Sequence, residues 1–133
     1  MKNDFKDILK DSKTIAVVGL SDNCEKTSNR VSRYMQDCGY NIIPVNPTIT
    51  EALGEKAYPS LKDIPQKVDI VNIFRRSNDV PPVVEDAISI GAKTVWMQLG
   101  ISNEEAAQKA AAAGLKVVQD KCIMVEHSRL QIE

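Results

Sequence analysis

The segment Thr14-Ile-Ala-Val-Val-Gly-Leu-Ser21 is an apolar run that breaks at a glycine and a serine. A polar stretch follows it, and a helical pattern begins near Ser28. A buried strand that leads through a short loop into a helix is typical of a nucleotide-binding α/β sheet, because backbone N–H groups at the start of the helix can bind phosphate. The segment therefore predicts a phosphate-facing loop that begins at Gly19.

Four more apolar runs follow, at residues 41–45, 69–74, 94–99 and 116–119. They are continuous rather than alternating, which is typical of strands covered on both faces. Helical patterns separate most of them, and Gly39, Gly91 and Gly114 stand where three of these helices would end. The alternation predicts a doubly wound, Rossmann-like α/β fold with a five-stranded parallel sheet in the order 3-2-1-4-5. We expect one domain over residues 1–133, with its ligand edge between the first and fourth strands.

The expected helices differ in how clearly they begin. A helix over 28–38 has Thr27 or Ser28 as its cap, and its apolar face includes Cys38 as a core residue. A helix over 79–90 begins at Asp79 with two prolines in its first turn. A helix over 102–113 begins with the capping box Ser102-Asn-Glu-Glu105. Residues 4–11 predict a leading amphipathic helix, 60–64 a short helix within a long loop, and 124–130 a closing turn or short helix.

Composition excludes several classes of function. The chain has 17 basic and 18 acidic residues, interspersed along the sequence, so no overall field would attract nucleic acid or an anionic membrane. No apolar run approaches the roughly 20 residues of a membrane span. Three widely spaced cysteines without a C-x-x-C pair indicate neither a disulfide framework nor a metal site. We expect a cytoplasmic protein.

The predicted phosphate loop does not match the dinucleotide fingerprint. NAD sites need further glycines after the first, and an acid at the end of the second strand for the ribose 2′-OH. Here Gly19 is followed by Leu-Ser-Asp-Asn-Cys24, and the second strand ends at the neutral Asn46 and Pro47. NAD is therefore a poor fit, and an ordinary strand-to-helix turn remains the alternative interpretation of Gly19 and Ser21.

The chain resembles the small bacterial CoA-binding domain proteins and, more distantly, the CoA-binding N-terminal domain of the succinate–CoA ligase α subunit. The resemblance spans about residues 10–130. It rests on these segments in this order: Ala16-Val-Val-Gly-Leu-Ser21, Gly39-Tyr-Asn-Ile-Ile-Pro-Val-Asn-Pro47, Asp69-Ile-Val-Asn-Ile-Phe-Arg-Arg-Ser77, Val95-Trp-Met-Gln-Leu-Gly-Ile101, Ala113-Gly-Leu-Lys-Val-Val118, and Asp120-Lys-Cys122 with Glu126-His127.

The resemblance implies coenzyme A or an acyl-CoA as the ligand. It implies that Ser21-Asp-Asn-Cys24 faces the diphosphate and that Met97-Gln-Leu-Gly100 matches the segment lining the pantetheine path. Asn41 departs from the ligase pattern, because a lysine that helps to hold CoA stands at the matching position there. The ligase's phosphorylated histidine belongs to a second domain, so its chemistry does not carry over to this chain.

Candidate ligand residues come from the loops that follow the predicted strands. Arginine suits phosphate because its planar guanidinium donates two hydrogen bonds at once, and solvated surface charge is the plainer interpretation of each cation. Lys121, after the fifth strand, is a further candidate cation. The predicted site comprises Gly19, Leu20, Ser21, Asp22, Asn23, Cys24, Lys26, Arg30, Asn46, Pro47, Phe74, Arg75, Arg76, Met97, Gln98, Leu99 and Gly100.

The sequence indicates no catalytic residues. His127, the single histidine, stands beside Glu126 but favours a structural or capping role, and no nucleophile with a base and an orienting group is apparent. We therefore expect a binding protein that senses, sequesters or presents CoA, with a protein partner or self-association left open. The alternatives are a small NAD(P)-dependent oxidoreductase, the CoA-binding part of a split acyl-CoA ligase, and a Rossmann-like module without a ligand.

Overall fold

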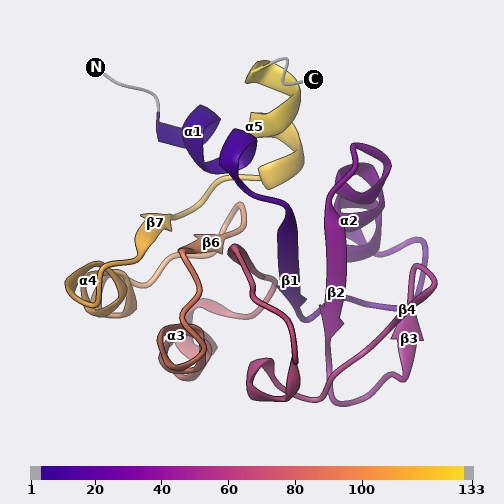
Figure 1. Ribbon diagram of the computed structural model, residues 1–133, viewed down its shortest axis with the longest axis horizontal. Coiled ribbons are helices and arrows are strands. Elements are labelled where there is room, and N and C mark those ends of the chain that lie inside the picture. Colours follow the sequence, from indigo (N-terminus) through magenta and orange to yellow (C-terminus); the bar gives the residue numbers. More distant parts are fainter. Residues whose placement is uncertain (1–3, 131–133) are drawn as a thin grey trace.

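The computed structural model describes residues 4–130. It confirms an α/β fold with a five-stranded parallel sheet (Figure 1). The sheet strands are β1 (Thr14–Val18), β2 (Asn41–Val45), β5 (Ile70–Ile73), β6 (Thr94–Met97) and β7 (Lys116–Val118). The helices are α1 (Asp4–Asp11), α2 (Thr27–Asp37), α3 (Val80–Ser89), α4 (Glu104–Ala112) and α5 (Ile123–Leu130). No helix in this described part is long and apolar enough to cross a bilayer.

The order of the strands differs from the prediction. The sheet runs β2-β1-β5-β6-β7, which is 2-1-3-4-5 in the order of its five strands, so the predicted 3-2-1-4-5 is wrong. The four residues of β5 are all buried, and β5 pairs with β1 on one side and β6 on the other. A strand in this position has backbone partners on both sides, whereas at an edge one row of its backbone groups would lack them. The point where the strand order reverses therefore lies between β1 and β5, and not between β1 and β6 as predicted.

Two helical layers cover the sheet, with α3 and α4 on one face and α1, α2 and α5 on the other (Figure 1). Alternate residues of each strand face alternate layers. In β1, Ala16 and Val18 pack in the first core, whereas Ile15 and Val17 pack in the second. Trp96 is completely buried on the second face, where its ring lies 5.6 Å from that of Phe5. The strands are thus packed against helices on both faces of the sheet.

The helices lie where they were expected, but some of their caps differ. Lys26 stands at the N-cap of α2, so the predicted cap at Thr27 or Ser28 is wrong. Asp79 stands at the N-cap of α3 as predicted, although its side chain makes no cap hydrogen bond. Asn103 caps α4 by accepting from the Ala106 N–H at 3.0 Å, which displaces the predicted capping box by one residue. Cys38 is exposed rather than a core residue, because it follows the end of α2.

The connection from β2 to β5 contains more structure than the sequence indicated. A small hairpin forms between β3 (Glu51–Ala52) and β4 (Glu55–Lys56), and the expected short helix is a 3₁₀ turn, η1 (Leu61–Asp63). Tyr58 bridges to Val45 at the outer edge of the sheet. A second 3₁₀ turn, η2 (Ser77–Asp79), leads from β5 into α3. The connection therefore reaches the carboxyl end of β2, beside the expected ligand edge.

Candidate functional site

Gly19 forms the turn that joins β1 to the loop before α2. Its φ is +90°, and a Cβ atom built on it would lie 2.4 Å from the Phe74 carbonyl oxygen at the end of β5. The Gly19 N–H donates to the Val45 carbonyl at 2.8 Å, and the Phe74 N–H donates to the Val18 carbonyl at 2.9 Å. Glycine is required here both for the backbone conformation and for the close approach. The turn brings the carboxyl ends of β1, β2 and β5 together.

The loop after Gly19 is shaped by its own polar side chains. The Ser21 N–H donates to the Ser28 hydroxyl, and Asn29, almost completely buried, donates from Nδ2 to the Ser21 carbonyl. Ser21 Oγ in turn accepts from the Asn23 N–H at 3.0 Å. Such side-chain-to-backbone bonds hold a tight loop in one conformation. Ser28, predicted as a helix cap, thus fixes the loop instead.

Asn46 joins the end of β2 to this loop. Its Nδ2 donates to the Leu20 carbonyl at 3.0 Å, while its Oδ1 accepts from both the N–H and the hydroxyl of Thr48. The amide therefore has a structural role, whether or not it also meets a ligand. Pro47 is exposed beside it. A neutral amide thus occupies the place where an NAD site carries an acid.

A cavity of about 140 Å³ opens at the carboxyl ends of β1, β2 and β5, on the side covered by α3. Arg75 lines it together with Asp86 of α3 and the apolar ends of β1 and β2. The Asp86 carboxylate lies 3.6 Å from the Lys62 Nζ. Pro59, Ser60 and Leu61, before and within η1, close its remaining side. These three residues were missed, because only their position beside β2 makes them part of the site.

Four of the predicted cations lie around this edge of the sheet. Lys26 and Arg30 stand at the start of α2, and Arg75 and Arg76 follow β5. Within residues 4–130, none of the four forms an ion pair. Arg76 and the two α2 residues are exposed, whereas Arg75 is half-buried. Unpaired cations at the ends of parallel strands suit an anionic ligand with more than one phosphate.

Of the site residues predicted at the end of β6, two are buried and two are exposed in the structure. Met97 is fully buried, and so is Leu20 on the first loop, so neither side chain reaches the surface in this structure. Gln98 is also buried, and its Oε1 accepts from the Ile123 N–H at the start of α5. Leu99 is 69% exposed, and the Gly100 N–H donates to Asp120. β6 ends at Met97, and Leu99 and Gly100 lie in the turn beyond it, at the rim.

Other predicted residues fall outside the cavity. Asp22, Asn23 and Cys24 are exposed on the first loop, and Phe74 is half-buried against the core on the face that packs α2. Asn41 begins β2 at the amino edge of the sheet, so its lack of charge has no bearing on the carboxyl edge. Lys121 is exposed, but its backbone is held by Met97 and Trp96. No group of metal-binding side chains occurs in the described part of the chain.

Comparison with known proteins relates this chain to a known protein family. The family model described as "CoA binding domain" matches residues 13–128. The uncharacterized protein YneT of Bacillus subtilis (strain 168) is 54% identical over 127 residues, which are 96% of this chain and 94% of YneT. A hypothetical protein of Pyrococcus horikoshii OT3 superposes with a TM-score of 0.93 at 45% identity, covering 96% of this chain and 89% of that one.

Longer enzymes share the same segment. Acetate–CoA ligase (ADP-forming) I of Archaeoglobus fulgidus is 29% identical over 121 residues, or 84% of this chain. The match spans 18% of that ligase. The shared part is thus a small fraction of the enzyme, and the rest of the ligase has no counterpart in the matched segment.

Proposed function

The chain belongs to the CoA-binding domain family, and from this membership we propose that it binds coenzyme A or an acyl-CoA between β1 and β5. The observation that carries the proposal is the cluster of unpaired cations around a glycine turn whose neighbouring strand ends in an amide. CoA carries a diphosphate and a 3′-phosphate, and arginines bind such groups through charge-assisted hydrogen bonds. An amide at the end of β2 favours this ligand over NAD.

The residues that would hold the ligand belong to three loops. The loop from Gly19 to Cys24, with Lys26 and Arg30 behind it, faces the diphosphate, and the start of α2 adds its positive dipole. Arg75 and Arg76 offer guanidinium groups beside the cavity. Leu99 and Gly100 give an exposed apolar rim for the pantetheine arm.

We propose binding without conversion of the ligand. The single histidine of the chain, His127, lines a cavity at the opposite, amino edge of the sheet, so it is remote from this site. Cys24 is exposed on the first loop, at the end of the site that would meet phosphate rather than the CoA thiol. The function is then to sequester, sense or present CoA, in the cytoplasm where CoA is used.

Titration calorimetry with CoA, acetyl-CoA, NAD, NADP and ATP tests this proposal. We expect CoA and acetyl-CoA to bind and NAD to bind far more weakly. The double variant Arg75→Ala/Arg76→Ala should lose at least about tenfold in affinity, since one charge-assisted hydrogen bond contributes about 1.5–3 kcal/mol. The control Lys67→Ala/Lys116→Ala removes the same charge near the opposite edge and should leave affinity unchanged. Micromolar NAD binding without CoA binding would refute the proposal.

A second function is favoured by the ligase similarity. The chain could supply the CoA-binding part of a split ADP-forming acyl-CoA ligase, whose remaining parts would be separate polypeptides. Affinity purification of the native chain would then recover a catalytic subunit, and the pair would form acyl-CoA. Recovery of the chain without such a subunit, with CoA bound, favours the first function.

A further inference from the structure

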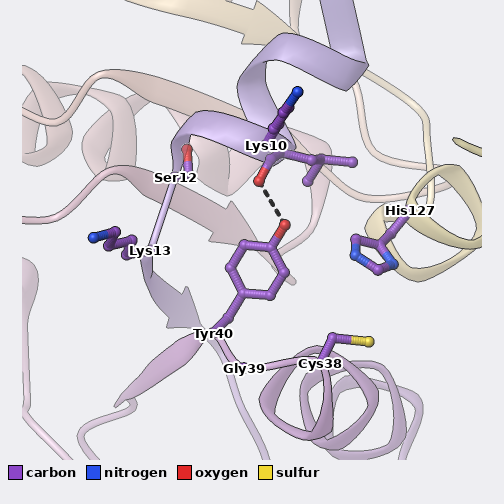
Figure 2. A pocket seen from close by; sticks show the side chains of 8 residues that line it. Lys10, Ser12, Lys13, Cys38, Gly39, Tyr40 and His127 are labelled. Carbon is purple, nitrogen blue, oxygen red and sulfur yellow. Dashed lines mark hydrogen bonds between the residues drawn. The ribbon is translucent and has the colours of Figure 1, made fainter. Parts of the chain in front are cut away.

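α5 is the helix that links the two edges of the sheet. The Ile123 N–H at its start donates to Gln98, which follows β6 at the carboxyl edge. Four residues later His127 lies at the amino edge, where it lines a cavity of about 150 Å³ (Figure 2). Ile123 is completely buried and His127 is 5% exposed. Because residues four apart share one face of a helix, a single buried face of α5 reaches from one edge to the other.

The His127 ring lies where α5 meets α2 and the start of β2. Its Nδ1 atom and the Tyr34 hydroxyl are hydrogen-bonded at 3.1 Å. The imidazole also packs edge-on against the rings of Tyr34 and Tyr40, at centroid distances of 5.6 and 5.8 Å. Tyr40 is itself held in place, because its hydroxyl donates to the Leu9 carbonyl at the cavity wall (Figure 2). The ring is therefore fixed on two sides as long as α5 stays packed on α2.

In the described part of the chain, no carboxylate is paired with the His127 ring. The charged side chains of the cavity wall, Lys10 and Lys13, are both cations, and Figure 2 shows their ammonium groups directed away from the imidazole. Glu126, next to His127 on α5, is paired with Arg129 at 3.5 Å. A protonated ring would therefore be a buried cation without an anionic partner, which costs free energy.

The phenols beside the ring stay uncharged at neutral pH. Burial, as the largest cause, raises the pKa of Tyr34, and it raises the pKa of Tyr40 to about 12. Cys38, at the end of α2, is the remaining titratable side chain of the cavity wall, and it is exposed to solvent. Burial lowers the pKa of His127 from its ordinary value of 6.5, so the imidazole is neutral at pH 7 and takes up a proton only in more acidic solution. At neutral pH, uncharged rings thus form this contact between α5 and α2.

The first turn of α5 is tied to the rim of the proposed CoA site. Gln98 Oε1 accepts from the Ile123 N–H at 2.9 Å, and the Gln98 side chain is buried. Just before α5, the Asp120 carboxylate accepts from the Gly100 N–H at 2.6 Å, beside the exposed Leu99. Asp120 has a φ of +58°, in the left-handed region, a conformation that this bond helps to hold. The position of the rim therefore depends on the position of α5.

Resting on the proposed CoA function, we propose that the His127–Tyr34 pair is a proton-operated latch that controls how tightly the chain binds CoA. With the ring neutral, α5 packs on α2, and its first turn holds the rim at Leu99 and Gly100 in place. A proton taken up from solvent leaves a cation among apolar rings, and α5 shifts outward so that water can hydrate it. The bonds between α5 and the rim then loosen, and CoA binds more weakly. The two edges are thus coupled through one turn of helix.

Nuclear magnetic resonance observes the latch directly, since the chain has a single histidine and its ring gives one signal to titrate. Hydrogen exchange of the α5 amides is then compared at pH 7.5 and at one unit below the measured His127 pKa, with α4, on the opposite face of the sheet, as internal reference. We expect the opening of α5 to increase by about tenfold for each unit by which the His127 pKa lies below 6.5. If α5 keeps its protection while His127 becomes protonated, the proposal is wrong.

Calorimetry with CoA at the same two pH values tests the coupling. The CoA 3′-phosphate titrates near pH 6 itself, so His127→Gln, which lacks the titrating ring, is the reference. On acidification the wild type should lose about fivefold more affinity than this variant, and saturating CoA should lower the His127 pKa by the same factor.

The outcomes separate the latch from the site that it serves. An equal loss of affinity in both proteins would overturn the latch and leave CoA binding intact. Absence of CoA binding at either pH would refute the proposed function and this regulation with it. Should His127→Gln not fold, the wild type decides alone: a His127 pKa that saturating CoA leaves unchanged would exclude the coupling.

Discussion

Replacing Gly19 by alanine tests whether the approach of the first turn to β5 organises the site. The new Cβ would lie 2.4 Å from the Phe74 carbonyl oxygen and 3.2 Å from its carbon, both of them backbone atoms. The β5 backbone cannot rotate away as a side chain would, since β5 pairs on both edges. We therefore expect the turn and the end of β5 to move apart.

The cost has two parts. A residue with a Cβ at a φ of +90° costs about 1–2 kcal/mol. Forcing an extra methyl into a packed site adds about 1–3 kcal/mol. Together they give a loss of about 3 kcal/mol, which for a chain of this size lowers the melting temperature by roughly 10 °C.

Gly114 provides the matched control. Its φ is +94°, but a Cβ there would meet no atom within 4 Å. Gly114→Ala should therefore cost only the conformational part, about 1–2 kcal/mol. Thermal and urea unfolding, followed by circular dichroism, measure both variants. Equal losses for Gly19→Ala and Gly114→Ala would show that the approach to Phe74 contributes nothing.

Three further predictions concern groups that support the strand ends. Asn103→Ala should destabilise the chain by about 1 kcal/mol in urea unfolding, because it removes the cap of α4; Ser102→Ala should not, and the reverse result would restore the predicted capping box. Gln98→Ala leaves the buried Ile123 N–H without its acceptor and should cost about 1–3 kcal/mol; an unchanged urea midpoint would refute this. Burial acts to raise the pKa of Asp69, but hydrogen bonds from backbone N–H groups and the charge of a lysine lower it below 3.8 overall. Its stabilising effect is therefore complete above the unfolded-state pKa and lost as the pH falls through the folded-state value; Asp69→Asn should flatten the acid side of the stability profile, and an unchanged profile would exclude this role.

The sequence predicted the strands well because their signal is local. Each continuous apolar run, such as Thr14–Val18, needs cover on both faces wherever it lies in the sheet. The order of the strands depends instead on where the connection between β2 and β5 returns. That connection consists mostly of loop, and no local sequence pattern in it predicts that β5 pairs with β1. Only the structure shows that residues 70–73 are all buried, as the interior position of β5 requires.

The site was predicted in outline for a similar reason. Parallel strand ends must share one edge, so Gly19, Asn46 and Arg75 could be grouped from the sequence. Whether a side chain near a strand end lies in the core or at the rim depends on where the strand ends, and β6 ends at Met97, two residues before the exposed Leu99. The contact between Tyr34 and His127 was not predicted because these residues are 93 positions apart and meet only where α5 packs on α2.

We propose that CoA occupies the edge between β1 and β5. Nuclear magnetic resonance titration of the ¹⁵N-labelled chain with CoA tests it residue by residue. We expect the amide signals of residues 19–28 and 74–76 to shift and saturate together, while those of Gly39 and Tyr40 at the amino edge stay in place. Saturable binding that shifts the amino-edge signals and leaves the Gly19 loop unchanged would contradict it.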